Sequence, residues 1–563
     1  MQRIHGMSVV ILCAACIAND GAVGKTSSRL TTVDDLQAIT PIRSTISYGP
    51  QAAYVPSTSF IGGETLDEQI VVSFEQSFWN DTPGDVLAPG WAVLSCPHDT
   101  LACPAGPIFT QTCSFDALPS TCNGTNAVPQ IPNHQTWLGR STIAAEPNAR
   151  ASGARNVVIA TLVDTNGNVD DAENVALVVS NDGGQSFVHS VIANVEGDGC
   201  DRGSQDAPSV TFDTSKDPPI GYVAWRNRNG GSWGGCINAF IIDDNGNPNV
   251  FAPSHSITGM DKSHSGLNEG QGYLKAVAAD GAVTVVYASD DTSTTCASGA
   301  TLPTDMGWGA VTSFTDGSKW TDSGNTFVQT NNFVWCPGSL QRGFKEFDAA
   351  IGPDGNLYVV VTSDNTGVRL FMSPARGIVA HSGGEYNDLT WREYCPLGPP
   401  PFTTRWRPLI TSSLCTAFPF QGDEIYHPSI GFDTNGRLLV SYYRDVDVGG
   451  STNHQMFVRA VTTPRAALPG TSELQNEQSI AAPFTLHFEV GYGPYDPFIP
   501  FHDHYRHPAN SLGWYTAVVG AGPQFPFPQG NKPFFVVFTT EDSGPQGEVL
   551  HVQSARVDFT TAQ

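Results

Sequence analysis

The chain has 563 residues, with 28 lysines and arginines against 54 aspartates and glutamates, so its formal net charge is -26. This balance excludes the basic stripe that phosphate binding needs, and we expect no nucleic-acid partner. Apolar residues make up 40% of the chain, which excludes wholesale disorder, while 57 glycines and 40 prolines indicate many short strands joined by turns rather than helices.

Residues 1–24 are predicted to be an export signal. An apolar run over residues 8–18 is followed by small and polar residues. The run is shorter than the roughly 20 residues that cross a bilayer, so it indicates a signal peptide, and no other segment suggests a transmembrane helix. Cleavage between Ala18 and Gly24 is one reading, and a lipoprotein site at Cys16 is the other. The protein is therefore expected to be secreted, periplasmic or at the cell surface.

A strand–turn–strand motif recurs along the chain. It is clearest at 427–445 (HPSIGFDTNGRLLVSYYRD), where two apolar runs flank a tight turn. Close copies occupy 207–225, 273–289 and 347–363, and looser copies occupy 141–162, 514–540 and 51–75. Further apolar runs follow several copies, so each unit is predicted to hold about four antiparallel strands.

Repeated four-stranded sheets that close radially form a β-propeller. We therefore predict an all-β fold: a single, monomeric β-propeller over 46–563, with long disulfide-clamped loops. Seven blades are favoured if 51–112 is a whole blade, and six if it only completes the last one. A stack of sandwich domains is the alternative, but the polar segment 25–45 is the only linker-like stretch. The last copy lacks a fourth strand after 548–557, so a strand from 25–45 is expected to pair there.

Two of the 12 cysteines lie in the predicted signal, and the ten that follow suit an oxidising compartment. Neighbours along the chain are expected to pair, as local clamps on inserted loops. The pairs are Cys96 with Cys103, Cys113 with Cys122, Cys200 with Cys236, Cys296 with Cys336, and Cys395 with Cys415.

Residues 180–187 (SNDGGQSF) follow the pattern Ser-x-Asp-x-Gly-x-Thr-Trp, with conservative changes at the last two places. Such a turn works because the aspartate accepts backbone N–H bonds, glycine takes a positive φ and the aromatic ring packs beneath the sheet. The motif resembles the Asp-box, or BNR, repeat of the sialidase superfamily, and 313–320 is a degenerate copy. The resemblance implies a propeller over about 51–557, with this turn as a folding element on the face opposite the site.

In a propeller, the start of each first strand and the end of each second strand surround one axial mouth. The charged residues at these places are Arg140; Asp206 with Arg226 and Arg228; Glu269 with Asp290 and Asp291; Glu346 and Asp348 with Asp364; His427 with Arg444 and Asp445; and Asp503 and His504 with Glu541 and Asp542.

The sialidase resemblance implies three arginines on an acidic sugar, a tyrosine nucleophile assisted by glutamate, and an aspartate acid/base. Arg140, Arg226 and Arg444 are the candidates for the arginine triad, and Tyr442 or Tyr443 is the candidate for the nucleophile. The candidate catalytic residues are Asp206, Arg226, Glu346, Tyr443, Arg444 and Asp445, and the candidate substrate-binding residues are Arg140, His427 and His504. The family's Arg-Ile-Pro motif is absent, so the sequence leaves open whether the protein is an enzyme; solvated rim charges and blade-to-blade ion pairs are the alternative.

A histidine-rich string, 501–507 (FHDHYRH), precedes the last copy of the repeat. Imidazole and carboxylate groups suit a divalent transition metal or a proton relay. The candidate metal ligands are His502, Asp503, His504 and His507. A structural or rim role and ligand binding are the alternatives. Residues 164–173 alternate oxygen ligands as a calcium loop does, but they depart from the EF-hand pattern, and a long polar hairpin is the favoured interpretation. A divalent cation, calcium or a transition metal, is the only cofactor that the sequence suggests.

Two functional classes stay open: a glycan-active enzyme, which would be a glycoside hydrolase, and a non-catalytic propeller that binds a glycan, small molecule or protein partner, as an adhesion module does. Because acids outnumber arginines at the predicted mouth, a neutral glycan or a divalent ion is expected to bind there more readily than a sialylated glycan. The residues expected to touch it are Asp206, Glu346, His427, Asp445 and His504.

Overall fold

The computed structural model describes residues 28–31, 37–38, 45–55, 58–59, 65–66, 68–78, 87–96, 108–114, 136–147, 150, 152–164, 174–213, 215–229, 232–257, 274–279, 281–291, 305–313, 326–327, 347–363, 367–374, 392–397, 403–408, 425–433, 436–449, 451–461, 472–473, 477–485, 516–520, 534–544 and 547–561. These residues form strands and the turns between them, with no helix among them. Within these ranges, therefore, nothing has the form of an apolar helix that could cross a membrane.

The described strands form seven larger antiparallel sheets, which we number in chain order. Sheet 1 contains β3 (Thr45–Val55), β6 (Glu68–Phe78), β7 (Leu87–Cys96) and β8 (Ile108–Ser114). Sheet 2 contains β9 (Thr136–Ala145), β10 (Val157–Asp164), β11 (Asn174–Ser180) and β12 (His189–Ile192). Sheet 3 contains β13 (Ser204–Asp213), β14 (Ile220–Asn229), β15 (Ser232–Ile242) and β16 (Pro248–Val250), with β17 (His255–Ser256) also on β15.

Sheet 4 contains β18 (Leu274–Ala279), β19 (Ala282–Asp291), β20 (Asp305–Ser313) and β21 (Thr326–Phe327). Sheet 5 contains β22 (Phe347–Ile351), β23 (Asn356–Ser363), β24 (Gly367–Pro374), β25 (Arg392–Leu397), β26 (Thr403–Pro408) and β30 (Ser472–Glu473). Sheet 6 contains β27 (Ile425–Phe432), β28 (Leu438–Val448), β29 (Ser451–Val461) and β31 (Gln478–Ser479).

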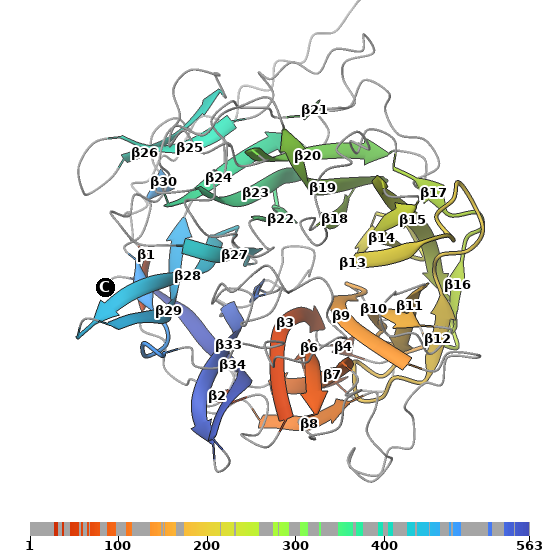
Figure 1. Ribbon diagram of the computed structural model, residues 1–563, viewed down its shortest axis with the longest axis horizontal. Helices are drawn as coiled ribbons and strands as arrows, with labels where there is room; N and C mark the ends of the chain where they lie inside the picture. The colour runs from red at the N-terminus through yellow and green to blue at the C-terminus, as the bar shows by residue number, and fades with distance from the viewer. Residues whose placement is uncertain are drawn as a thin grey trace, which may run out of the picture.

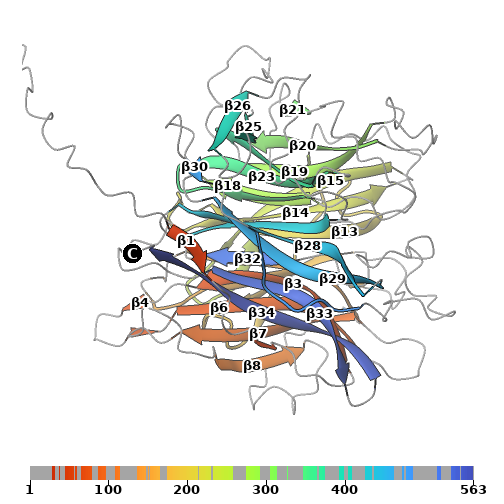
Figure 2. The ribbon, with the colours of Figure 1, turned by 90° about the vertical axis from the view of Figure 1, so that its left-hand side faces the viewer.

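Sheet 7 draws strands from both ends of the chain. It contains β32 (Ala517–Gly520), β33 (Phe534–Gly544), β34 (Gly547–Thr561) and β1 (Ser28–Thr31), and β2 (Gln37–Ala38) also pairs with β34. β1 is antiparallel to β34, with Ser28 opposite Thr561 and Thr31 opposite Asp558. Figure 2 shows β1 beside one end of the long strand β34. A separate two-stranded sheet joins β4 (Thr58–Ser59) to β5 (Thr65–Leu66).

The seven larger sheets surround a common centre (Figure 1), and one edge strand of each sheet lies innermost. Innermost strands of consecutive sheets contact one another in the order β3, β9, β13, β18, β22, β27 and β32, and β32 contacts β3 again. The starts of these inner strands, and the strand ends paired with them, therefore lie around the same central region.

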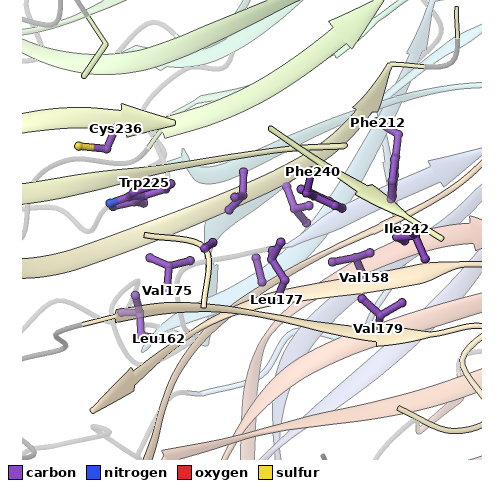
Figure 3. Packing of buried hydrophobic residues seen from close by; sticks show 14 of the residues in the cluster. Val158, Leu162, Val175, Leu177, Val179, Phe212, Trp225, Cys236, Phe240 and Ile242 are labelled. Carbon is purple, nitrogen blue, oxygen red and sulfur yellow. The ribbon is translucent and has the colours of Figure 1, made fainter. Parts of the chain in front are cut away.

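Apolar side chains fill the space between neighbouring sheets. Strand β11 reads NVALVVS and is buried at six consecutive positions, because it is covered on both faces. Between sheets 2 and 3, Leu177 belongs to one buried cluster with Trp225, Phe212 and Phe240, and the two phenylalanine rings meet edge to face at 5.6 Å (Figure 3). Burial of these rings stabilises the contact between the sheets by roughly 2–3 kcal/mol for each large side chain.

The turn at 180–187 lies between β11 and β12, the third and fourth strands of its sheet. The Asp182 carboxylate accepts a bond from the Ser186 N–H at 2.9 Å, and Gly183 and Gly184 have φ of 78° and 92°. Phe187 is buried and meets Trp91 of sheet 1 edge to face at 5.1 Å. The residues of this turn thus shape the hairpin and anchor sheet 2 against sheet 1.

Cys200 and Cys236 form a disulfide across 36 residues, which confirms that predicted pair. The bond ties the segment after β12 to β15. Each of the other four predicted pairs includes at least one cysteine outside the described residues, so those pairs stay predictions.

Candidate functional site

The innermost strands of four sheets carry a β-bulge at the same place. In each strand, two residues stand opposite one residue of the second strand, where the pairing register shifts. The first bulged residue is left-handed in all four sheets, with φ between 44° and 61°. We call these residues the bulge row: Gly49, Arg140, Ala207 and His427. Bulges redirect a strand end and its side chains, and they are frequent beside functional sites.

A buried polar residue follows each bulge. We call these residues the tie row: Gln51, Thr142, Ser209 and Ser429. The Ser209 hydroxyl accepts a bond from the Ala276 N–H of sheet 4 at 3.0 Å. The Ser429 hydroxyl shares its single proton between the Thr516 carbonyl at 3.1 Å, just before β32 of sheet 7, and the Asp348 carboxylate of sheet 5 at 2.7 Å. Three tie-row residues, Gln51, Ser209 and Ser429, therefore hold neighbouring inner strands together by hydrogen bonds to backbone groups.

The start of the inner strand in sheet 3 brings three of the predicted site residues together. Arg140 of β9 forms an ion pair with one oxygen of Asp206, and the Arg226 guanidinium of β14 lies 3.6 Å from the other oxygen. The Ala207 N–H donates to the first oxygen at 2.6 Å. The side chains of Arg140, Asp206 and Arg226 are 16%, 7% and 10% exposed, so solvent screens their charges only weakly. We call these three residues the Arg–Asp–Arg cluster.

Asp348, another predicted rim residue, joins three sheets. Its carboxylate accepts bonds from the Ser429 hydroxyl at 2.7 Å and the Ile430 N–H at 3.2 Å, both on β27. The Lys275 ammonium of β18 lies 3.6 Å from its other oxygen. Asp348 is buried among these donors, so it holds sheets 4, 5 and 6 together at the centre.

His427 and Tyr443, two predicted site residues of sheet 6, lie edge to face at 6.1 Å. The Tyr443 hydroxyl donates to the Thr539 carbonyl at 2.7 Å and accepts from the Thr539 N–H at 2.8 Å, so it bridges to β33. Burial raises the pKa of Tyr443 well above its ordinary value. A neutral phenol with both bonding directions occupied suits a structural tie between sheets 6 and 7.

Arg444 has a different partner from the other two predicted arginines. Its guanidinium lies 2.8 Å from a carboxylate oxygen of Glu477 and 4.2 Å above the Phe457 ring. Tyr442 donates to the other Glu477 oxygen at 2.6 Å, and burial and the Glu477 charge raise the pKa of this tyrosine well above its ordinary value. Arg140 and Arg226 thus share Asp206, whereas Arg444 is held on sheet 6.

Glu477 was not foreseen by sequence reasoning. It lies directly before the two-residue strand β31, outside every copy of the repeat. Asp445 was foreseen as a mouth residue, and its carboxylate lies 2.9 Å from Nδ1 of the buried His454 on β29.

The remaining candidates lie outside the described residues. They are Glu346, His502, Asp503, His504 and His507, together with most of the loop at 164–173. Within the described ranges there is no group of three or more histidine, cysteine, aspartate or glutamate residues arranged to hold a metal ion.

No protein-family model matches the chain, and no curated protein matches it. Solved structures give matches at low identity. An α-L-arabinofuranosidase from Fusarium graminearum is 9% identical, with 76% of this chain and 98% of that chain covered and a TM-score of 0.35. The β-propeller domain of the trilobed protease from Pyrococcus furiosus is also 9% identical, covering 81% and 96% at a TM-score of 0.28. A levansucrase from Bacillus subtilis is 12% identical, covering 57% and 83% at 0.28.

Proposed function

We propose that the chain is an exported, sialidase-like protein whose seven sheets are the blades of one closed β-propeller, and that it binds or hydrolyses glycans at the axial mouth. Contacts between consecutive inner strands, from β3 round to β32 and back, support the closed ring. The pairing of β1 with β34 supports closure at the outer edge, because it joins the two ends of the chain in one sheet.

The observation that carries the glycan proposal is the Arg–Asp–Arg cluster at the start of the inner strands. Two planar guanidinium groups and one carboxylate offer fixed donors and acceptors, the groups that recognise sugar hydroxyls by directional hydrogen bonds. Asp206 has cationic partners at both oxygens, so its first role in this proposal is to orient Arg140 and Arg226. Hydrolysis would also need a second carboxyl group, and Glu346, which directly precedes β22, is the candidate.

The charge of the cluster bears on the choice between a neutral glycan and a divalent ion. Two arginines against one aspartate leave an excess positive charge at this part of the mouth, which disfavours a cation. We therefore propose a glycan and not a divalent ion as the ligand of this cluster, and the excess of acids around the whole predicted mouth favours a neutral glycan over a sialylated one. Tyr443 and Arg444 are assigned to blade packing, because Thr539 and Glu477 already bond them.

A non-catalytic glycan-binding propeller is the second candidate, and the occupation of both Asp206 oxygens favours it. An array of immobilised neutral and sialylated oligosaccharides, probed with and without a chelator, tests binding. Release of reducing sugar from the bound oligosaccharides then separates the two candidates. Binding of neutral oligosaccharides that is insensitive to the chelator supports the proposal, and the absence of any bound glycan would contradict it.

A further inference from the structure

The bulge row and the tie row differ in chemistry, although each row holds equivalent positions in sheets 1, 2, 3 and 6. The tie row is uniformly polar and buried, as a repeated structural element should be. The bulge row is also largely buried, since only Arg140 is partly exposed, but its residue types differ: glycine, arginine, alanine and histidine. Side chains of such different size and charge at one repeated position indicate that this position does not serve packing alone.

Three bulge-row residues adopt a backbone conformation that their side chains disfavour. Arg140, Ala207 and His427 have φ of 54°, 44° and 50°, in the left-handed region where glycine is favoured over residues with a Cβ. Glycine would be the simplest choice for stability at all three places. Ala207 has this strained backbone although its side chain is a single methyl group, one carbon atom more than glycine.

Ala207 adjoins the acid that Arg140 binds. The Arg140 side chain reaches from sheet 2 to Asp206 of sheet 3, the residue directly before Ala207. The Ala207 N–H also bonds that carboxylate, so the left-handed residue helps to orient it. On the other side of sheet 2, the equivalent place in sheet 1 is Gly49. The only long side chain in the bulge row of sheets 1 to 3 thus stands between two sheets with small residues at that position.

We propose that Arg140, the bulge-row residue that is not buried, contacts the ligand and determines its specificity, and that Ala207 is kept small so that it does not displace Asp206, the acid that holds Arg140. This inference rests on the proposed glycan function. Arg140 then recognises the ligand, while Gln51, Ser209 and Ser429 of the tie row bond neighbouring sheets to one another. Changes in the two rows should therefore have separable effects on binding and on stability.

A matched pair at one position tests the proposal. Ala207→Asn adds bulk but keeps a residue that tolerates the left-handed region, whereas Ala207→Gly leaves the space open. Ser209→Ala, in the tie row two residues later, is the control. For each full-length variant, the thermal unfolding midpoint and binding to the panel of immobilised neutral oligosaccharides are measured.

Ala207→Asn should lower the binding signal about tenfold or more, because its larger side chain would displace the Asp206–Arg140 pair, and it should lower the midpoint by a few degrees, because Ala207 is buried. Ala207→Gly should keep binding and should not lower the midpoint. Ser209→Ala should lower the midpoint and leave the glycan pattern unchanged. Normal binding by Ala207→Asn, or a glycan pattern altered by Ser209→Ala, would overturn the proposal.

If the parent protein binds no glycan on the panel, the proposed function fails and the specificity claim fails with it. The midpoints still decide whether the two rows have different structural roles. A midpoint lowered as much by Ala207→Gly as by Ser209→Ala would show that the bulge row serves packing after all.

Discussion

The Gln51 side chain donates a hydrogen bond to the Thr516 carbonyl at 3.2 Å, although 465 positions separate the two residues. The same carbonyl accepts from Ser429, and the Thr516 hydroxyl donates to the His427 carbonyl at 3.0 Å. Thr516 therefore links sheets 6, 7 and 1 near the centre. β1 completes sheet 7 at its outer edge, so the amino-terminal segment that precedes sheet 1 belongs to the last sheet.

Deletion of residues 25–40 should lower the stability of sheet 7, in which strands from both ends of the chain pair. It removes β1 and β2 and leaves the outer edge of β34 without its partners. We expect the thermal midpoint to fall by several degrees, roughly what a loss of a few kcal/mol causes in a domain of this size. Circular dichroism at increasing temperature measures the change, and an unaltered midpoint would show that these strands do not contribute to closure.

Glu477 should contribute to stability through its two partners. Glu477→Ala removes the anion that pairs with Arg444 and accepts from Tyr442, so both groups lose a partner in a largely buried place. Because the Arg444 and Glu477 side chains keep 18% and 16% of their surface exposed, we expect a loss of about 1–3 kcal/mol in the free energy of unfolding. Glu477→Gln keeps the shape and should lose less. Equal losses in chemical denaturation would argue against a role for the charge.

Tyr443 should make the protein sensitive to alkali. Its folded-state pKa is raised, so the unfolded chain releases the phenolic proton first as pH rises above about 10. The stability associated with the protonated phenol is thus fully present below that pH and is lost progressively above it. Tyr443→Phe should be destabilised by about 1–2 kcal/mol at neutral pH through loss of the Thr539 bonds, and should show a shallower decline above pH 10. Parallel alkaline declines in the two proteins would contradict this.

The Cys200–Cys236 disulfide should be worth about 4 kcal/mol, the loop-closure value for a closed loop of this length. Replacing both cysteines with serine should lower the unfolding free energy by about that amount, measured by chemical denaturation. Non-reducing peptide mapping of the parent checks all five sequential pairs at once, and a bridge from Cys96 or Cys395 to a remote cysteine would refute the local-clamp prediction.

Much of the architecture was predictable because it repeats. The motif at 427–445 corresponds to β27 and β28, and the copy at 207–225 corresponds to β13 and β14, since apolar alternation around a tight turn specifies a hairpin wherever it occurs. The turn at 180–187 was also predictable, because its Asp182 bond and its glycines with positive φ are contacts and conformations within a few residues of one another.

The grouping of the site residues was less predictable, because it depends on how sheets pack. Arg140 and Arg226 were expected at the mouth and do meet Asp206, yet their shared carboxylate follows from the register between sheets 2 and 3. Arg444 was expected beside them and instead binds Glu477, an acid that no repeat marks. Local patterns identify residues at strand ends, but only the packed sheets decide which of them become partners.

The most direct test of the proposed function is glycan binding by Arg140→Ala and Asp206→Asn on the array of neutral and sialylated oligosaccharides, with Glu477→Gln as the control away from the cluster. We predict that the parent binds neutral oligosaccharides, that both cluster variants lose this binding by about tenfold or more, and that the control retains it. Unchanged binding in both cluster variants, or binding confined to sialylated oligosaccharides, would contradict a neutral-glycan site at Arg140, Asp206 and Arg226.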